Sequence, residues 1–188
     1  MVVGKGFAGR YLISEEVSYI TQHGLSSLAV DGKRVLIIIP DGTRTMPMPL
    51  MFDLFETQLA PRVAALDYLV ALGTHPMMSD EQLSKLVGRP VRNEQAGNSH
   101  IFNHHWEDPA NFVKLGAIPA TEIGEITSGL VAQEVPVRLN KLILDYNQLI
   151  ICGPVFPHEV VGFSGGTKYF FPGIGGPESS TSLTGWVR

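Results

Sequence analysis

The run VLIII at residues 35–39 has no polar position on either face of a strand. Continuous apolar runs of this length, rich in β-branched residues, are typical of a central parallel strand that helices cover on both sides. Pro40 follows directly and ends the run, because proline has no N–H to donate to a neighbouring strand. We therefore expect residues 35–39 to lie in the middle of a parallel sheet.

Strand patterns alternate with helix patterns on both sides of this run. One helix is expected from Ser14, which can cap it, to about Leu28, and another is expected to begin at the capping-box sequence SDEQ of residues 79–82. Residues 122–133 are ambiguous and favour two short strands around Gly129. Further helices are expected at 47–59 and 141–148, and further strands within 63–72, 113–118 and 149–152. This alternation predicts an α/β fold with a mostly parallel, Rossmann-like sheet and helices on both faces.

The composition fits one globular domain over residues 1–188, because 44% of the residues are hydrophobic and 17% are charged. The formal net charge of −4 lacks the basic balance that is typical of nucleic-acid binding. No apolar run reaches the ~18 residues of a membrane span, and the N-terminus has no signal-peptide pattern. The single cysteine, Cys152, excludes a disulfide within the chain and reads as a small buried residue. We expect a cytoplasmic protein whose partners include neither nucleic acid nor membrane.

Polar and charged residues follow the first two strong strands. Asp41, Thr43 and Arg44 come after the first strand, and His75 comes after the second. In open parallel sheets, ligands bind outside the carboxyl ends of the strands, so these residues are expected to face one crevice. Arg44 with Thr43 can bind a phosphate group. The alternative is an Asp-Gly turn with a surface arginine.

The loop after the third strong strand carries His158 and Lys168, with a glycine-rich segment, Ser164-Gly165-Gly166, between them. That segment can present backbone N–H groups to an anion, or it can be a plain tight turn. The lysine can be a nucleophile, an anion clamp or an attachment point, or simply a solvated side chain. With His75, His158 can form an acid/base pair, and the alternative is two loop histidines that bind backbone groups.

A third histidine group comprises His100, His104 and His105. Their spacing is not that of a helical metal-binding pair, and no cysteine accompanies them. We therefore favour a structural or pocket-lining role for this group over a metal site.

Four motifs in order carry a resemblance to a known family: DGTR at 41–44, ALGTH at 71–75, NHHW at 103–106 and the run from Pro157 to Gly173. Together they resemble the N-terminal domain of the nickel-dependent lactate racemase family, over residues 4–178. The resemblance implies a nickel-pincer nucleotide, a pyridinium bisthiocarboxylate mononucleotide whose two sulfur-containing arms hold nickel (Ni). It implies that Lys168 tethers this cofactor through a thioamide.

The resemblance also implies a reaction and roles for the loop residues. His75 and His158 act as the acid/base pair on a small-molecule 2-hydroxy acid, while hydride moves from its α-carbon to the cofactor and returns to the opposite face. The loops with Asp41, Thr43 and Arg44 and with Ser164, Gly165 and Gly166 lie around the cofactor, near its phosphate. The chain would thus be the cofactor-binding part of a racemase or epimerase.

Two departures from the family pattern affect this hypothesis. The family places a histidine nickel ligand sixteen positions after the tethering lysine, where this chain has Thr184. The family's C-terminal domain, which closes over the site, is absent from the sequence. The alternatives are a non-catalytic module that binds a nucleotide or sugar acid, and a metal-free isomerase. Exposure of the crevice without a lid also predicts self-association, such as a homodimer.

Overall fold

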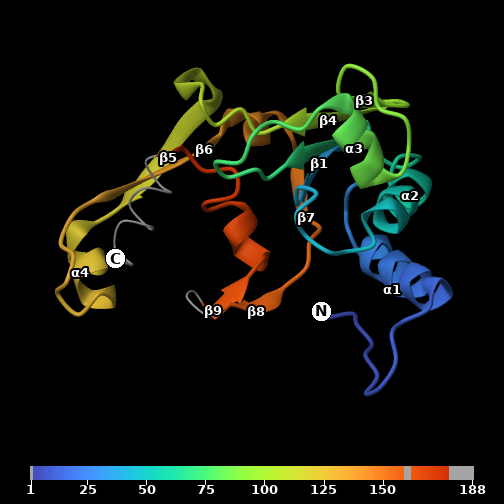
Figure 1. The fold of residues 1–188 in the computed structure, drawn as a ribbon, viewed down its shortest axis with the longest axis horizontal. Coiled ribbons are helices and arrows are strands. Elements are labelled where there is room, and N and C mark those ends of the chain that lie inside the picture. Colours follow the sequence, from blue (N-terminus) through green and yellow to red (C-terminus); the bar gives the residue numbers. More distant parts are fainter. Residues whose placement is uncertain (1, 159–161, 178–188) are drawn as a thin grey trace.

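A five-stranded sheet forms the centre of the protein (Figure 1). The structure is a computed structural model and describes residues 2–158 and 162–177. The strand order is β3-β4-β2-β1-β7, in which every neighbouring pair is parallel except β3 with β4. The strands are β1 (Arg34–Ile39), β2 (Ala65–Val70), β3 (Gln95–Ala96), β4 (Ser99–Asn103) and β7 (Gln148–Ile151).

The expected central strand is confirmed. β1 lies between β2 and β7, and Ile37 pairs with Tyr68 on one side and with Ile150 on the other. Residues 35–39 have no exposed surface. An apolar side chain on each face of such a strand is removed from water, which stabilises the sheet from both sides.

Three α-helices cover one face of the sheet (Figure 1). Odd-numbered residues of β1, such as Ile37, pack here with Phe52 of α2 and Leu83 of α3. The helices are α1 (Ser14–Ser26), α2 (Met48–Gln58) and α3 (Asp80–Val87). The other face is covered by two 3₁₀-helices, η2 (Lys141–Asp145) and η3 (Gly166–Tyr169), whose residues pack against Leu36 and Ile38. The predicted α/β class, with a mostly parallel sheet flanked by helices, is confirmed.

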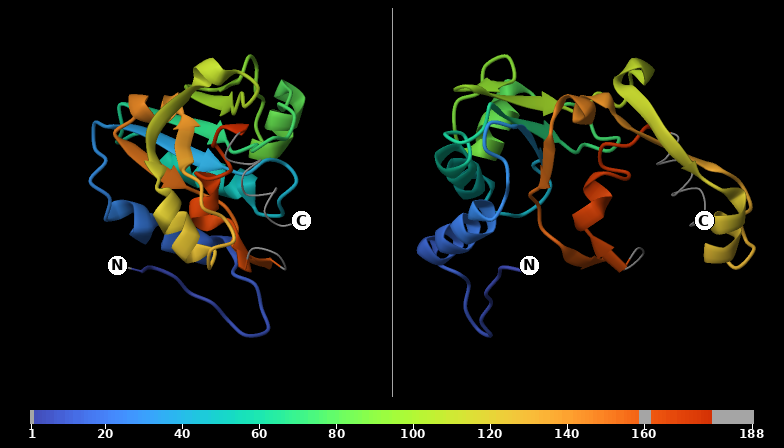
Figure 2. Two further views of the ribbon diagram at one scale, coloured as in Figure 1. Left: turned by 90° about the vertical axis from the view of Figure 1, so that its left-hand side faces the viewer. Right: turned by 180° about the vertical axis from the view of Figure 1, so that it is seen from behind.

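Two hairpins project from the sheet and give the protein an arched shape (Figure 2). The longer one, the arm, pairs β5 (Phe112–Ile118) with β6 (Val135–Asn140) and carries α4 (Ala120–Ile126) near its tip. A short 3₁₀-helix, η1 (Pro109–Asn111), leads into it. The shorter hairpin pairs β8 (Phe156–His158) with β9 (Gly162–Ser164), and η3 follows it.

Several local expectations were correct and others were wrong. Ser79 caps α3 and Gly88 ends it in the left-handed region, as the capping pattern predicts. Ser14 does not cap α1, because Ile13 is the N-cap residue and its N–H donates to Glu16. Residues 122–133 form no pair of strands but begin with the end of α4. The helix expected at 141–148 is the shorter η2, which gives way to β7 at Gln148.

No helix in the described part of the chain is long and apolar enough to cross a membrane.

The turn that ends α3 offers a test of packing. Gly88 has φ +72°, and a Cβ placed there would lie 2.7 Å from Cβ of Pro49 in α2. Gly32 has a similar φ of +69°, but a Cβ there would meet nothing within 4 Å. We predict that Gly32→Ala lowers the free energy of unfolding by about 1 kcal/mol through backbone strain alone, and that Gly88→Ala lowers it by about 2–4 kcal/mol because overpacking is added. Urea unfolding of both variants measures the difference, and equal losses would show that α2 moves away at no cost.

Candidate active site

The first part of the site forms where β1 and β2 end. β1 and β2 are parallel and in register up to the pair Ile39 and Val70, so their carboxyl ends lie at one edge of the sheet. Asp41 follows β1 after Pro40, and His75 closes the turn after β2, where its N–H donates to the carbonyl of Leu72 at 2.9 Å. The register of the two strands therefore brings these side chains together.

The Asp41 carboxylate binds three donors. Nδ1 of His75 lies 2.6 Å from Oδ2 of Asp41. Oδ1 of Asp41 accepts from the Thr43 hydroxyl at 2.5 Å and from the Thr43 N–H at 3.1 Å. Burial by itself would raise the pKa of Asp41, but the hydrogen bonds from Thr43 and His75 outweigh it, and the pKa lies below the ordinary value of 3.8. Asp41 is therefore ionised at neutral pH.

An ionised carboxylate only accepts hydrogen bonds, so Nδ1 of His75 carries a proton. In neutral imidazole this leaves Nε2 as the proton acceptor. The backbone of His75 is also held, because Nε1 of Trp106 donates to the His75 carbonyl at 3.0 Å. About half of the His75 side chain is exposed, so a ligand can reach the ring. Such an arrangement can serve as a general base, because the carboxylate fixes the tautomer of the ring.

A cavity of about 680 Å³ lies beside this pair. Asp41, Thr43, Arg44 and His75 are in its wall, so the structure brings together the predicted residues of the first two loops. The Thr43 hydroxyl already donates its proton to Asp41, so as placed it can accept but not donate to a phosphate. Arg44 is exposed, and its guanidinium has no hydrogen bond or ion pair within the described residues. Arg44 is thus the donor of this loop that remains for an anion.

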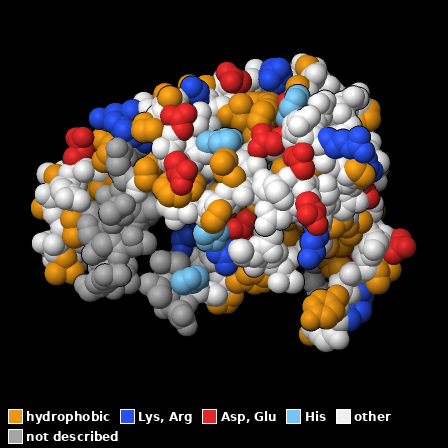
Figure 3. All heavy atoms as spheres, turned by 45° about the horizontal axis from the view of Figure 1, so that its top comes forward, with side chains coloured by type: hydrophobic (Ala, Val, Ile, Leu, Met, Phe, Trp, Pro, Cys, Tyr) orange, Lys and Arg blue, Asp and Glu red, His pale blue; other side chains and the backbone are white. Residues whose placement is uncertain are grey.

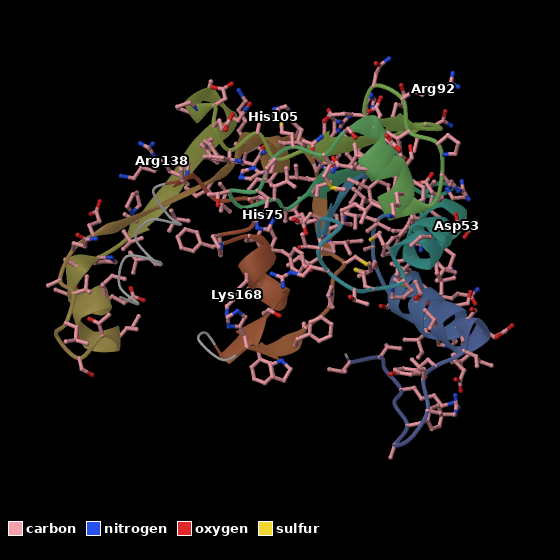
Figure 4. All side chains as sticks on the ribbon, in the orientation of Figure 1. Asp53, His75, Arg92, His105, Arg138 and Lys168 are labelled. Atoms are coloured by element: carbon pink, nitrogen blue, oxygen red, sulfur yellow. The ribbon has the colours of Figure 1, made fainter. Side chains whose placement is uncertain are left out.

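The second part of the site is the β8–β9 hairpin with η3, which carries His158, Ser164, Gly165, Gly166 and Lys168. Nζ of Lys168 donates to the carbonyl of Phe163. Gly165 has φ +81°, and a Cβ there would collide with the carbonyl of Pro154, so only glycine fits the turn. Figure 4 places Lys168 on η3, below the loop that carries His75. His158, the last residue of β8, is exposed.

The segment around η3 connects the two parts. The Gly73 N–H, two residues before His75, donates to the carbonyl of Gly173 at 2.8 Å. Tyr169 of η3 packs so closely on Gly153 that a Cβ there would collide with the phenol ring. Burial raises the pKa of Tyr169 to about 12, with Arg44 acting in the opposite direction, so this ring lies within electrostatic reach of Arg44.

The structure does not bring all the predicted residues into one cavity. In the part of the chain that is described, the cavity wall includes none of the five residues of the hairpin and η3. In Figures 1 and 2, η3 stands between the β8–β9 hairpin and the loops at the strand ends. The roles assigned to these five residues, and to the strand-end group, stay predictions.

Of the third histidine group, His104 has structural contacts. His104 is fully buried, its Nδ1 accepts from Nδ2 of Asn140 at 3.1 Å, and its Nε2 lies 3.2 Å from the carbonyl of Gly175. The side chain of Asn103 binds both backbone groups of Met78. These contacts support the structural reading for His104, while His100 and His105 are exposed. The described residues contain no cluster of three or more His, Cys, Asp or Glu that could hold a metal ion.

Further residues of the site were missed by sequence reasoning. The cavity wall also contains four methionines, of which Met46 and Met48 come from the β1–α2 segment and Met77 and Met78 from the β2–α3 segment. Lys85 of α3 lies in the same wall. The methionines directly flank the predicted loops, and this clustering was the signal available. Figure 3 shows histidine, acidic and basic side chains close together on one face of the molecule.

Fold and site together define an α/β domain with a hydrogen-bonded aspartate–histidine pair at the carboxyl ends of parallel strands. A match to the family described as the lactate racemase N-terminal domain covers residues 10–182. The chain belongs to this family. It is 30% identical over 155 residues to a lactate racemase of Thermoanaerobacterium thermosaccharolyticum, and 30% identical over 153 residues to one of Lactiplantibacillus plantarum. Each alignment covers 80% of this chain and 32% of the relative, so the chain spans about a third of the length of these curated relatives.

Solved structures show the same fold. A crystal structure of a protein from Thermotoga maritima matches 94% of this chain and 41% of that chain, with a TM-score of 0.79 and 27% identity. The lactate racemase apoprotein from T. thermosaccharolyticum matches 86% of this chain and 37% of that chain, with a TM-score of 0.64 and 22% identity. The second likeness concerns the fold alone.

The buried His104 predicts how stability depends on pH. Burial lowers its pKa to about 4, from an ordinary value of 6.5, so the unfolded chain binds a proton more readily than the folded one. Stability should be fully present above about pH 6.5 and should fall as the pH drops towards 4, by about 3 kcal/mol in total at 1.36 kcal/mol per pKa unit. Denaturant unfolding across this range measures the slope. His104→Gln should flatten it, and His23→Gln, on helix α1, should not; an unchanged slope in His104→Gln would contradict the assignment.

Proposed function

We propose that this chain is the cofactor-binding domain of a racemase or epimerase that acts on 2-hydroxy acids with a nickel-pincer nucleotide attached to Lys168. The family is established, but the chain covers only a third of its curated relatives, so the activity is our inference. The observation that carries the proposal is the hydrogen-bonded pair of Asp41 and His75 at the edge of an open cavity.

The residues of the chain fit the organic part of such a cofactor. Gly165 and Gly166 are consecutive residues with positive φ, a backbone form that can turn N–H groups towards an anion. Lys168 supplies a primary amine on the adjacent 3₁₀-helix, and Arg44 supplies donors for an anionic group of the cofactor or the substrate. In such a cofactor, nickel would be held by the sulfur arms of the nucleotide, as the resemblance to the family implies. Position 184, where the family pattern has a histidine, lies outside the described residues.

When bound, the cofactor would supply the acceptor and donor of hydride. The chain's own contribution is two proton transfers, one from the substrate oxygen and one to the product oxygen, after which both imidazoles re-equilibrate with water. Nε2 of His75 takes the hydroxyl proton of the substrate, while Asp41 stabilises the imidazolium through Nδ1. When the carbonyl form is reduced on its opposite face, a proton must be returned from the other side, and we assign this step to His158. Inversion itself would come from return of hydride to the opposite face of the carbonyl carbon, and His158 would serve the product oxygen on that side.

Attachment of the cofactor is the direct test of the proposal. We predict that protein purified from a host that makes the cofactor carries a covalent adduct on Lys168, detected by intact mass and peptide mapping. Lys168→Arg should carry none, because a guanidinium does not replace the amine in a thioamide, whereas Lys114→Arg on the arm should still be modified. An unmodified wild-type chain, in a host where a lactate racemase is modified, would favour a non-catalytic binding module instead.

The Asp41–His75 pair predicts a second outcome in the cofactor-loaded protein. In Asp41→Asn, the amide oxygen can satisfy the two Thr43 donors, and the amide N–H then faces Nδ1 of His75. This places the imidazole proton on Nε2 and removes the base, so racemisation should fall by about 10²–10⁴-fold, as in His75→Asn. Chiral chromatography of the product measures the rate. His23→Asn on α1 is the control, and full activity of Asp41→Asn would refute the role of the carboxylate.

A further inference from the structure

The wall of the cavity beside His75 is rich in flexible methionine side chains. Met46, Met48, Met77 and Met78 line it, and these are four of the six methionines of the chain. Proline and leucine side chains complete the apolar part, including Pro49, Leu72, Pro76 and Leu86. Unbranched thioether side chains adapt to ligands of different shape, and they are characteristic of surfaces that bind flexible apolar groups.

The cavity is larger than a small acid requires. Its volume of about 680 Å³ lies within the range of about 300–1,000 Å³ that is typical of pockets for drug-sized ligands. His75, the proposed base, lies in the wall, so the reacting hydroxyl belongs at this end. The rest of the cavity is then available for the remainder of the substrate, and it has room for a chain much longer than a methyl group.

The charges of the wall favour an anionic ligand. Its Lys and Arg residues are Arg44, from the loop after β1, and Lys85, from α3. Its carboxylate, Asp41, is already bound by Thr43 and His75. Lys85 is exposed and has no ion pair among the described residues, and Glu81, one helical turn before it, is not in the wall. Arg44 and Lys85 thus offer two cationic side chains from two different elements. A monocarboxylic acid needs only one such cation to bind its carboxylate.

We propose that the methionine-lined cavity holds the side chain of the substrate, and that Lys85 selects 2-hydroxy acids that carry a second carboxylate at the far end of an apolar chain. Arg44 binds the carboxylate next to the reacting hydroxyl, the methylene chain lies against the methionines, and Lys85 binds the distal carboxylate. This inference rests on the proposed function, because it takes the position of the hydroxyl from the role of His75.

The methionines provide the measurement. We predict that, in protein labelled with ¹³C at the methionine methyl groups, 2-hydroxyadipate shifts the signals of Met46, Met48, Met77 and Met78. The signal of Met51, which lies on α2 outside the wall, should stay fixed. 2-Hydroxyhexanoate, which has the same chain length but no distal carboxylate, should bind at least about tenfold more weakly, a difference of about 1.4 kcal/mol.

Lys85→Met is the decisive variant, because it keeps an unbranched side chain and removes the charge. It should bind the two acids with equal affinity, while Lys114→Met, on the arm, should retain the preference. Equal binding of both acids by the wild type, or a preserved preference in Lys85→Met, would overturn the proposal. So would inorganic phosphate shifting the same four signals as strongly as the diacid, since the cavity would then be a general anion site.

The experiment separates this proposal from the proposed function. If racemisation depends on His75 but no acid shifts the four methionine signals, the pocket assignment is wrong and the enzymatic role remains. If the diacid binds as predicted but Lys168 never carries an adduct, the pocket stands as an acid-binding site and the reaction is wrong.

Discussion

The parallel register of β1 with β2 is the constraint on which the site depends. The two strands run side by side from the pair Arg34 and Ala65 to the pair Ile39 and Val70, and both end at one edge of the sheet. A short bond of 2.6 Å between Asp41 and His75 is possible only because of this common end point. Burial of β1 on both faces fixes the register, since a shift by one residue would exchange the side chains of the two cores.

The hydrogen bonds of the Asp41 carboxylate limit the donors that the loop after β1 can offer to a phosphate. All three of its recorded bonds serve the orientation of His75 and the shape of the turn, so this loop is organised around a base more than around a phosphate. The two parts of the site are connected by a few close contacts to the backbone. The Gly73 N–H donates to the carbonyl of Gly173, and the ring of Tyr169 packs on the backbone of Gly153. Glycine is required where the ring of Tyr169 lies directly on the chain, and this close packing brings η3 next to the strand ends.

Much of the fold could be predicted from the sequence because its signals are local. The apolar run of residues 35–39 and the capping box before α3 each identify an element without further information. β4 and β6 were not predicted, because His100 and Arg138 interrupt the apolar pattern and both strands are defined by their partners. In the site, the loops and their order were predictable. The pairing of Asp41 with His75 and the methionine wall were not, because both depend on the distance between segments far apart in the chain.

The concentration of methionines in one wall has a chemical consequence beyond binding. Oxidation of a thioether to a sulfoxide replaces a flexible apolar group with a polar one. Met77 is 53% exposed, so it is the first of the four to meet a dissolved oxidant, whereas Met48 is almost fully buried. Peroxide would therefore oxidise the exposed Met77 before the buried Met48. The cavity would lose its apolar character from the solvent side inwards, while the sheet beneath it stays intact.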